Sequence, residues 1–296
     1  MHQFVMINNK RFEFVLKGKK GTPIVILTGM GCSFEEWYEV TESISDTNRV
    51  IMFHRPGLGE SEVSERERNT IQTVEETNIL LKLLEIEEPV LMVGHSYGGL
   101  CAQHFVKMYP QKVRGLVLVD STSEDLEMLD MLDLPIINEE SSDEEWIRKC
   151  MSYSLLTKEE LRKIINPTLT KKQKLLRHDV QQHLIEFQLK PELYKTMKAE
   201  VENWKKDAQI IKRLGGINDI PLVVIGRDKD YNIEIGIEEG LPEWEIRLFE
   251  KTWQELIRKQ CNLSQNSELI FAKQSTHSIY LDRPDILIEA INKVLI

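Results

Sequence analysis

The sequence predicts an α/β fold, in which a doubly wound, mostly parallel sheet carries an inserted helical cap. Three observations predict this architecture. Short runs that are apolar at every position recur along the chain, and such strands are typical of a parallel sheet covered by helices on both faces. Segments with helical periodicity alternate with these runs. One long interval contains helical pattern alone, which indicates an insertion between two strands.

The predicted strands begin with a hairpin at a sheet edge. Residues 4–6 and 12–16 are rich in apolar side chains, and Asn8-Asn9 lies between them, a pattern typical of a β-hairpin. Six apolar runs follow, and each is expected to form one strand of the parallel sheet. They cover residues 24–27, 50–53, 90–93, 116–119, 222–225 and 269–272.

Helices are predicted between these strands. Thr73 and Glu76 have the spacing of a capping box ahead of an apolar stripe. A second helix is expected over residues 96–109, where a proline follows. Pro284 is a favoured first-turn residue and is expected to open the last helix.

The interval from residue 123 to residue 219 is the predicted insertion. It has no strand-like run, and Ser142 with Glu145, like Thr157 with Glu160, has the spacing of a capping box. A compact domain seldom carries so long a connection without a function. The expected division is an α/β core of residues 1–122 and 220–296 and a helical cap of residues 123–219.

Composition and charge exclude several classes of protein. The 296 residues suffice for one large α/β domain with an insertion. A net charge of −10 argues against a surface that tracks nucleic-acid phosphates. No run approaches the roughly 18 apolar residues of a membrane span, and no signal-peptide pattern is visible. We therefore expect a cytoplasmic protein with no nucleic-acid or membrane partner; the sequence does not predict its oligomeric state.

The cysteines are expected to be reduced thiols. They lie far apart and form no C-x-x-C pair, so neither a disulfide framework nor a zinc site is predicted. The sequence also has no glycine-rich phosphate loop and no convincing metal-ligand spacing. We therefore expect no cofactor and no metal. The cysteines are Cys32, Cys101, Cys150 and Cys261.

A G-x-S-x-G motif directly follows one predicted strand and precedes a helix. In this context the turn is so sharp that the backbone of Ser96 is strained and its hydroxyl projects above the sheet. Gly94 and Gly98 are expected because a Cβ at either position would collide with neighbouring backbone. The helix N-terminus offers donors for a developing oxyanion. Ser96 is the predicted nucleophile; the alternative is a glycine-rich turn that merely holds a serine.

With this motif, four further segments make the chain resemble the α/β-hydrolase superfamily over essentially its whole length. They look like the oxyanion loop, the R-x-G-x-G-x-S stretch, the sixth strand and the catalytic-histidine loop, at residues 24–31, 54–61, 116–120 and 276–284. The resemblance implies that the backbone N–H groups of Met30 and Tyr97 form the oxyanion hole. Two departures stand out: Thr28 replaces the usual histidine of the oxyanion loop, and the acid motif is irregular.

His277 is the predicted general base. A serine hydroxyl needs a base to take its proton, so a histidine must lie nearby. Of the seven histidines, only His277 follows the last predicted strand, at the sheet edge where Ser96 also emerges. His95 is expected to point back into the sheet, and His54 to pack within a loop.

The acid that orients His277 remains open among three aspartates. Asp228, which follows the predicted strand of residues 222–225, is the favoured candidate. The superfamily pattern most often places the acid one residue later, where Lys229 stands. Asp230 and Asp120 are the alternatives.

The predicted activity is hydrolysis of small to medium carboxylic esters through a Ser-His-Asp triad and an acyl-enzyme. An aminopeptidase or amidase is the second candidate, because acidic cap residues such as Asp143 and Glu144 could hold an ammonium group. A ligand-binding homologue that lost turnover is the third. A serine at position 96 argues against dehalogenases and epoxide hydrolases, which resemble this fold but use a carboxylate nucleophile.

Overall fold

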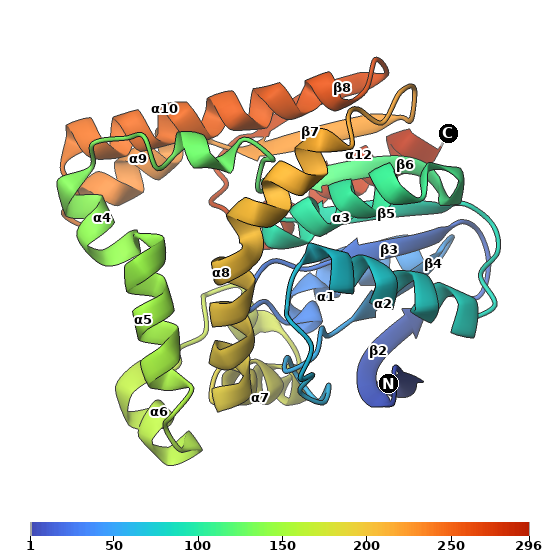
Figure 1. Ribbon diagram of the computed structural model, residues 1–296, viewed down its shortest axis with the longest axis horizontal. Coiled ribbons are helices and arrows are strands. Elements are labelled where there is room, and N and C mark those ends of the chain that lie inside the picture. The colour runs from blue at the N-terminus through green and yellow to red at the C-terminus, as the bar shows by residue number, and fades with distance from the viewer. Residues whose placement is uncertain (1, 296) are drawn as a thin grey trace.

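A single sheet of eight strands forms the centre of the computed structural model, which describes residues 2–295 (Figure 1). The strand order is β1-β2-β4-β3-β5-β6-β7-β8, and every pair from β4 to β8 is parallel. The first two strands add an antiparallel edge. The strands are β1 Gln3–Ile7, β2 Lys10–Lys17, β3 Pro23–Leu27, β4 Arg49–Phe53, β5 Val90–His95, β6 Val113–Val119, β7 Leu222–Arg227 and β8 Ser267–Ala272. The predicted hairpin and all six predicted parallel strands are confirmed.

Helices cover both faces of the sheet, as the wholly apolar strands predicted. On one face, side chains of α2 (Thr70–Leu83), α3 (Tyr97–Met108) and α10 (Glu243–Gln260) join the first core cluster. On the other face, α1 (Tyr38–Ser45) and α12 (Pro284–Leu295) pack in the second. The short α11 (Ile279–Asp282) precedes α12, and α9 (Lys229–Glu238) precedes α10. Alternate residues of each buried strand serve the two faces.

The expected capping box of α2 is wrong. The helix begins at Thr70, and the side chain of Asn69 accepts a hydrogen bond from Gln72 N at 3.0 Å. Glu76 instead forms a buried ion pair with Arg68, with 2.6 Å between Oε1 and Nη1. Tertiary pairing therefore decides the role of this glutamate, and an asparagine earlier in the chain makes the cap.

Only helices occur between β6 and β7 in the described chain. Thr157 forms a complete capping box with Glu160 at α6, as predicted. Ser142 caps α5 by accepting from Glu145 N, but the Glu145 side chain pairs with Arg148 and does not complete the predicted box. Figure 1 shows α4, α5 and α6 standing apart from the sheet, with the long α8 between them and the core. The elements are η3 Leu126–Met128, α4 Pro135–Ser141, α5 Asp143–Tyr153, α6 Lys158–Ile165, η4 Gln173–Leu175, α7 His178–Phe187 and α8 Pro191–Arg213.

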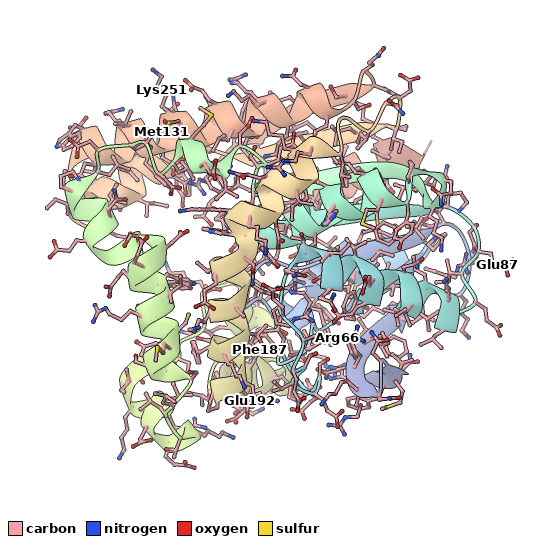
Figure 2. All side chains as sticks on the ribbon, viewed as in Figure 1. Arg66, Glu87, Met131, Phe187, Glu192 and Lys251 are labelled. Carbon is pink, nitrogen blue, oxygen red and sulfur yellow. The ribbon has the colours of Figure 1, made fainter. Side chains whose placement is uncertain are left out.

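The helix α8 joins these helices to the sheet. Its buried Leu193, Tyr194 and Met197 share a cluster with Leu58 of the core and Phe187 of α7. Figure 2 shows Phe187 among the helices, whereas charged side chains such as Lys251 and Glu87 project from the surface. No helix within residues 2–295 is long and apolar enough to cross a bilayer.

Candidate active site

The turn between β5 and α3 has the strained geometry that the motif predicts. Ser96 has φ +52° and ψ −127°, a conformation that L-residues seldom adopt. A Cβ on Gly98 would lie 2.2 Å from the carbonyl oxygen of Leu27, and one on Gly94 would lie 2.6 Å from Cα of Gly99. Both distances are too short for non-bonded atoms. Glycine at these two positions therefore permits the close approach of strand, turn and helix.

The backbone of Ser96 is tied to the neighbouring strand, while its hydroxyl is not used as a helix cap. Its N–H donates to Val119 O at 3.3 Å, and its carbonyl accepts from Thr122 N at 3.1 Å. The side chain makes no capping hydrogen bond with α3, and the residue is partly exposed. The hydroxyl is therefore left free for other chemistry.

His277 lies next to this turn, on the loop between β8 and α11. Its Nδ1 is 2.6 Å from Oδ2 of Asp120, and its side chain is 38% exposed. Because the carboxylate can only accept, Nδ1 carries the proton and Nε2 presents a lone pair. The backbone carbonyl of His277 accepts from Nε2 of His95 at 3.0 Å, and the two rings lie 4.6 Å apart. His277 is thus held through both its ring and its main chain.

His95 differs from the expectation that it points back into the sheet. Its buried ring packs beside His277 and edge-on to Trp37 and Tyr280. Burial, with the nearby His277 ring, lowers the pKa of His95 to about 3. The ring is therefore neutral near pH 7, with its proton on Nε2, where it supports the loop that carries His277.

Asp120, directly after β6, is the carboxylate that contacts His277. It is fully buried and accepts four hydrogen bonds. Oδ1 accepts from Trp253 Nε1 at 2.9 Å and from Arg227 N at 3.1 Å; Oδ2 accepts from Arg227 Nη1 at 3.1 Å in addition to the imidazole. Burial alone would raise the pKa of Asp120, but the Arg227 charge and these hydrogen bonds hold it well below its usual range. Asp120 is therefore ionised.

Arg227 balances the buried charge around Asp120. Its Nη2 and Nε lie 2.6 and 3.1 Å from the two carboxylate oxygens of Glu250 on α10. Its guanidinium also lies over the Trp253 ring, 4.5 Å from the centroid. The arginine therefore links β7, the turn after β6 and α10 in one buried network.

The favoured acid, Asp228, does not contact His277. It caps α9, where Oδ1 accepts from Asp230 N at 3.2 Å, and its Oδ2 accepts from Gln274 N at 3.0 Å. Asp230 is exposed and faces Lys229. The assignment of Asp228 as the partner of His277 is therefore corrected to Asp120, because β6 ends between the serine turn and β7.

The expected oxyanion loop lies against the serine turn. The Gly98 contact described above brings α3 onto the end of β3, just before Thr28. Thr28, in place of the usual histidine, donates its hydroxyl proton to Cys32 O at 3.1 Å. The N–H of Tyr97 lies in the first turn of α3, where helix geometry leaves donors free. The roles of Met30 and Tyr97 as oxyanion donors remain predictions.

A buried arginine connects this loop to the inserted helices. Arg55 donates to the carbonyls of Thr28 and Gly29 at 2.9 and 3.1 Å. Its Nε and Nη2 lie 2.6 and 3.2 Å from the carboxylate oxygens of Glu200 on α8. Since both charged side chains are buried, each needs the other. The insertion thus fixes the backbone from which Met30 extends.

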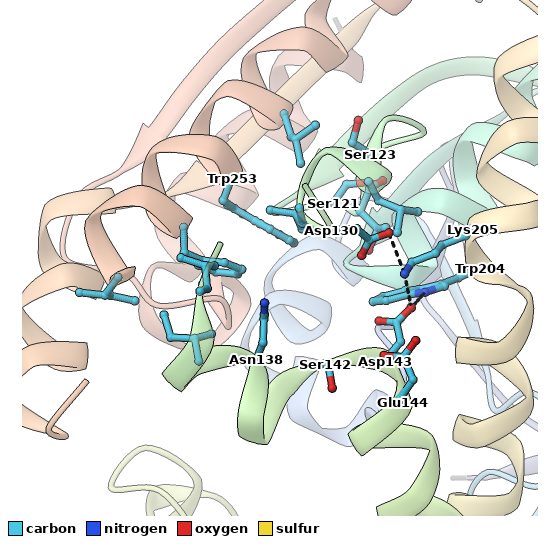
Figure 3. Close-up of a pocket in the computed structure, with 18 of the residues that line it drawn as sticks. Ser121, Ser123, Asp130, Asn138, Ser142, Asp143, Glu144, Trp204, Lys205 and Trp253 are labelled. Atoms are coloured by element: carbon cyan, nitrogen blue, oxygen red, sulfur yellow. Dashed lines mark hydrogen bonds and ion pairs between the residues drawn. The ribbon is translucent and has the colours of Figure 1, made fainter. Parts of the chain in front are cut away.

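A cavity of about 660 Å³ lies between the inserted helices and α10 (Figure 3). Ser96 and His277 do not line it, but it abuts their surroundings. Its wall includes Trp253, which donates to Asp120 and lies edge-on to the His277 ring at 5.8 Å. The wall also includes Thr122, whose backbone N–H donates to the carbonyl oxygen of Ser96. Just over half of the lining residues are apolar: Leu126, Leu129, Leu134, Ile137, Trp204, Leu241, Ile246, Phe249, Trp253 and Leu256.

Two of the three carboxylates that line the cavity are paired. Lys205 of α8 lies 2.8 Å from carboxylate oxygens of both Asp130 and Asp143. Asp143 also accepts from the indole of Trp204 at 2.9 Å. These contacts, dashed in Figure 3, neutralise acidic groups of the cavity, including the Asp143 that the sequence offered for an ammonium group.

Sequence reasoning missed Arg227, Trp253 and His95. One signal was present: Arg227 is a charged residue at the end of a wholly apolar strand, and burial of such a side chain requires a carboxylate partner. Nothing in the local sequence singled out Trp253 on an amphipathic helix. The four cysteines are free thiols, as expected.

Comparison with known proteins finds similarity to the alpha/beta hydrolase fold. A family model described as the alpha/beta hydrolase fold matches residues 22–162. An uncharacterized protein of Bacillus subtilis (strain 168), YqjL, is 25% identical over 278 residues, which cover 94% of this chain and 85% of that protein. A putative methylesterase of Arabidopsis thaliana is 27% identical over 119 residues, but the match covers only 39% of this chain and 34% of that protein.

Solved structures share the whole fold at low sequence identity. A Vigna radiata epoxide hydrolase mutant has a TM-score of 0.72 at 15% identity, with 100% of this chain and 98% of that chain covered. A probable hydrolytic enzyme from Pseudomonas aeruginosa has a TM-score of 0.67 at 19% identity, with coverage of 100% and 94%. A putative lipase from Acinetobacter baumannii has a TM-score of 0.66 at 18% identity, with coverage of 99% and 91%.

Proposed function

Because the chain is similar to the alpha/beta hydrolase fold over residues 22–162 and carries a serine at the strained turn after β5, we propose that it is a serine hydrolase of the α/β-hydrolase superfamily acting on carboxylic esters. One observation carries the proposal: the ring of His277 donates to the buried Asp120 while its loop is held against the residue next to Ser96. An imidazole so oriented is a competent general base. The serine, the acid and the imidazole follow the ends of β5, β6 and β8 of one sheet.

The proposed reaction is a two-step acyl transfer. Ser96 Oγ attacks the ester carbonyl carbon while His277 Nε2 takes the hydroxyl proton, and Asp120 stabilises the resulting imidazolium. The N–H groups of Met30 and Tyr97 stabilise the oxyanion. The imidazolium then protonates the leaving alcohol as the carbon–oxygen bond breaks. Water, deprotonated by the same imidazole, attacks the acyl-enzyme and releases the carboxylic acid and the serine.

The cavity beside the site supports esters of small to medium size with an apolar group. Its volume of about 660 Å³ falls within the range of small-molecule pockets, and its lining is mainly aliphatic and aromatic. We propose that the acyl or alkyl part of the ester occupies it, with the inserted helices as the cap that shapes the entrance. Since Lys205 already pairs with Asp130 and Asp143, these two carboxylates are less suited to bind a substrate ammonium group, which leaves Glu144 as the cavity carboxylate on which the aminopeptidase hypothesis depends.

A non-catalytic role and epoxide hydrolysis are also less well supported than ester hydrolysis. The non-catalytic hypothesis depended on an irregular acid motif, but Asp120 provides the acid without that motif. Two epoxide hydrolases among the structural neighbours share the fold at 18% and 15% identity. Ser96 stands where that chemistry needs a carboxylate nucleophile.

Labelling with a fluorophosphonate tests the proposed nucleophile. We expect one adduct on Ser96 in the wild type and none in Ser96→Ala. Turnover of aryl acetates should fall by at least about 10⁴-fold in the same variant. Unchanged labelling in Ser96→Ala, or an unlabelled wild type that binds but does not hydrolyse any ester of a graded panel, would overturn the proposal.

A pair of variants on α4 tests the role of the cavity. Asn138 lines the cavity and is exposed, whereas Glu139 is exposed outside its lining. We expect Asn138→Trp to shift the preference toward shorter esters by about tenfold in relative kcat/KM. Glu139→Trp should leave the chain-length profile unchanged. Identical profiles for both variants would place the ester elsewhere.

A further inference from the structure

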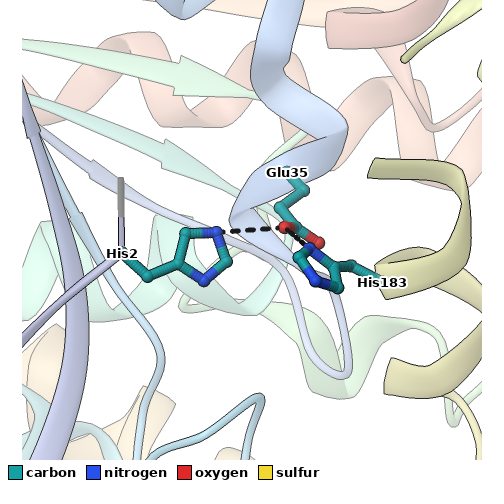
Figure 4. A group of neighbouring side chains, drawn as sticks. All are labelled: His2, Glu35 and His183. Atoms are coloured by element: carbon teal, nitrogen blue, oxygen red, sulfur yellow. Dashed lines mark hydrogen bonds and ion pairs between the residues drawn. The ribbon is translucent and has the colours of Figure 1, made fainter. Parts of the chain in front are cut away.

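Two histidines and one glutamate, side chains that commonly bind metal ions, lie close together outside the candidate active site. His2 precedes β1, Glu35 belongs to the short helix η1 (Phe34–Trp37), and His183 projects from α7 (Figure 4). His2 Nε2 is 3.1 Å and His183 Nδ1 is 2.8 Å from Oε1 of Glu35. One donor atom from each residue lies within 4.8 Å of the other two. The sequence predicted no metal site because these residues are far apart along the chain.

The second nitrogen of His2 is oriented by another carboxylate. Its Nδ1 is 2.6 Å from Oε1 of Glu13, which is only 2% exposed. The other Glu13 oxygen accepts from His54 Nδ1 at 2.7 Å and from Glu60 N at 2.7 Å. The buried Glu13 therefore directs Nε2 of His2 toward Glu35. A carboxylate that orients a histidine in this way is the usual outer support of a metal-bound imidazole.

We propose that His2, Glu35 and His183 bind one zinc ion. Two imidazole nitrogens and one carboxylate oxygen form a ligand set that zinc prefers, and that the hard oxygen-seeking ions calcium and magnesium do not. Because the three donor atoms already lie within 4.8 Å of one another, adjustment of the side chains would bring them to the usual zinc distances of roughly 2.0–2.2 Å. A hollow of about 220 Å³ beside the three residues gives the ion an entrance and leaves room for a water ligand.

Zinc at this site would join three parts of the fold. The ligands come from the start of the edge strand, from the core segment after β3 and from α7 of the insertion. Binding to the folded chain alone stabilises it by mass action, so the Tm rises with the free zinc concentration. The site would thus fix α7 to the core, independently of the proposed hydrolase activity.

An ion-paired cluster without metal is the competing interpretation. Hydrogen bonds from His2 to Glu13 and Glu35 raise the pKa of His2 to about 9, so a protonated ring can itself neutralise the two carboxylates. The experiment must therefore measure the metal directly.

Equilibrium dialysis of the full, untagged chain against zinc, followed by metal analysis, provides that measurement. We expect one saturable zinc per chain and a higher Tm when zinc is present. His183→Ala and Glu35→Gln should each weaken zinc binding by at least about 100-fold and abolish the Tm increase. His178→Ala is the matched control, because His178 is on the same helix outside the cluster.

The His183 side chain is 55% exposed, so its removal leaves the core intact, and circular dichroism of the zinc-free variants checks this. Zinc binding that survives in both His183→Ala and Glu35→Gln, or that is lost equally in His178→Ala, would overturn the proposal. So would the absence of a saturable site in the wild type, which is the result that the ion-paired cluster predicts. Equal binding of magnesium would contradict the choice of metal.

Discussion

The turns after β6 and β7 look alike in sequence but differ in what their aspartates do. Asp120 and Asp228 each follow a buried apolar strand, and both are buried. Asp120 contacts the imidazole of His277, whereas Asp228 caps α9 and holds the backbone of Gln274. β6 lies beside β5 in the sheet, and β7 lies one strand further away. Strand order therefore decides which carboxylate reaches the histidine.

The largest effect is expected from exchanging the two aspartates for asparagine in turn. Asp120→Asn replaces one carboxylate oxygen by an NH₂ group and removes the charge that stabilises the imidazolium, so the tautomer of His277 is no longer fixed and kcat for an aryl acetate should fall by about 10⁴-fold. Asp228→Asn keeps a helix cap and should change kcat by less than about tenfold. Steady-state kinetics of the two variants measures this contrast. The reverse ranking would restore Asp228 as the acid.

The next effect is on stability and concerns the buried cation beside Asp120, the Arg227 guanidinium, which has no buried counterpart beside Asp228. Arg227→Met would leave Asp120 and Glu250 buried without their shared cation. We expect the free energy of unfolding to fall by about 3–5 kcal/mol, measured by urea denaturation. Lys273→Met, which removes the exposed cation 3.5 Å from Asp228, is the control and should change it by less than about 1 kcal/mol. Equal losses would mean that the two turns are electrostatically equivalent.

His95 supports the main chain of the His277 loop, whereas Asp120 holds the imidazole ring of His277. Loss of the His95 side chain should therefore have an intermediate effect on kcat. His95→Ala removes the donor to the His277 carbonyl, so we expect kcat to fall by about 100-fold with little change in KM. His95→Gln retains an N–H donor and should recover part of this loss. A purely structural role predicts equal kcat for both variants at equal Tm.

A smaller effect is expected at the cap of α9. Asp228→Ala removes the acceptor for Asp230 N and Gln274 N and should lower the free energy of unfolding by about 1 kcal/mol. Asp228→Asn should retain most of that stability. Denaturation curves of the two variants measure the difference, and coincident midpoints would contradict the capping role.

The smallest effect is the pH dependence that Asp120 contributes. The pKa of Asp120 is lower in the folded chain than in the unfolded chain, so ionised Asp120 stabilises the fold. This stabilisation is complete above the pKa of the unfolded chain, about 4, and is lost as the pH falls toward the pKa of the folded chain. Only part of this loss is accessible before the protein unfolds in acid. Between about pH 6 and about pH 3, the stability of the wild type should therefore fall more steeply than that of Asp120→Asn. Parallel curves would show that the pKa of Asp120 is not lowered by folding.

Much of the fold and part of the site follow from local sequence. Continuous apolar runs predicted the parallel strands, because a strand buried on both faces has no polar side to show. Gly94, Ser96 and Gly98 predicted the strained turn from the motif. The contacts that require Gly94 are with residues 98–102, only a few positions along the chain, whereas the contact that requires Gly98 is with Leu27 of β3 and forms only in the folded chain. His277 was placed at the correct sheet edge because parallel strands all end on one side.

Only the tertiary structure showed which aspartate contacts His277 and which residues hold that aspartate. It alone also showed that two histidines and a glutamate meet at the candidate zinc site. Asp120 could not be separated from Asp228 by local pattern, because their difference lies in which strand is the neighbour. The chain positions of His2, Glu35 and His183 gave no sign of their approach, because η1, α7 and the edge strand meet only after packing. Periodicity and steric limits act locally, so the sequence alone determined the strands and the serine turn. Charge pairing acts through space, so only the folded chain decided which carboxylate meets which imidazole.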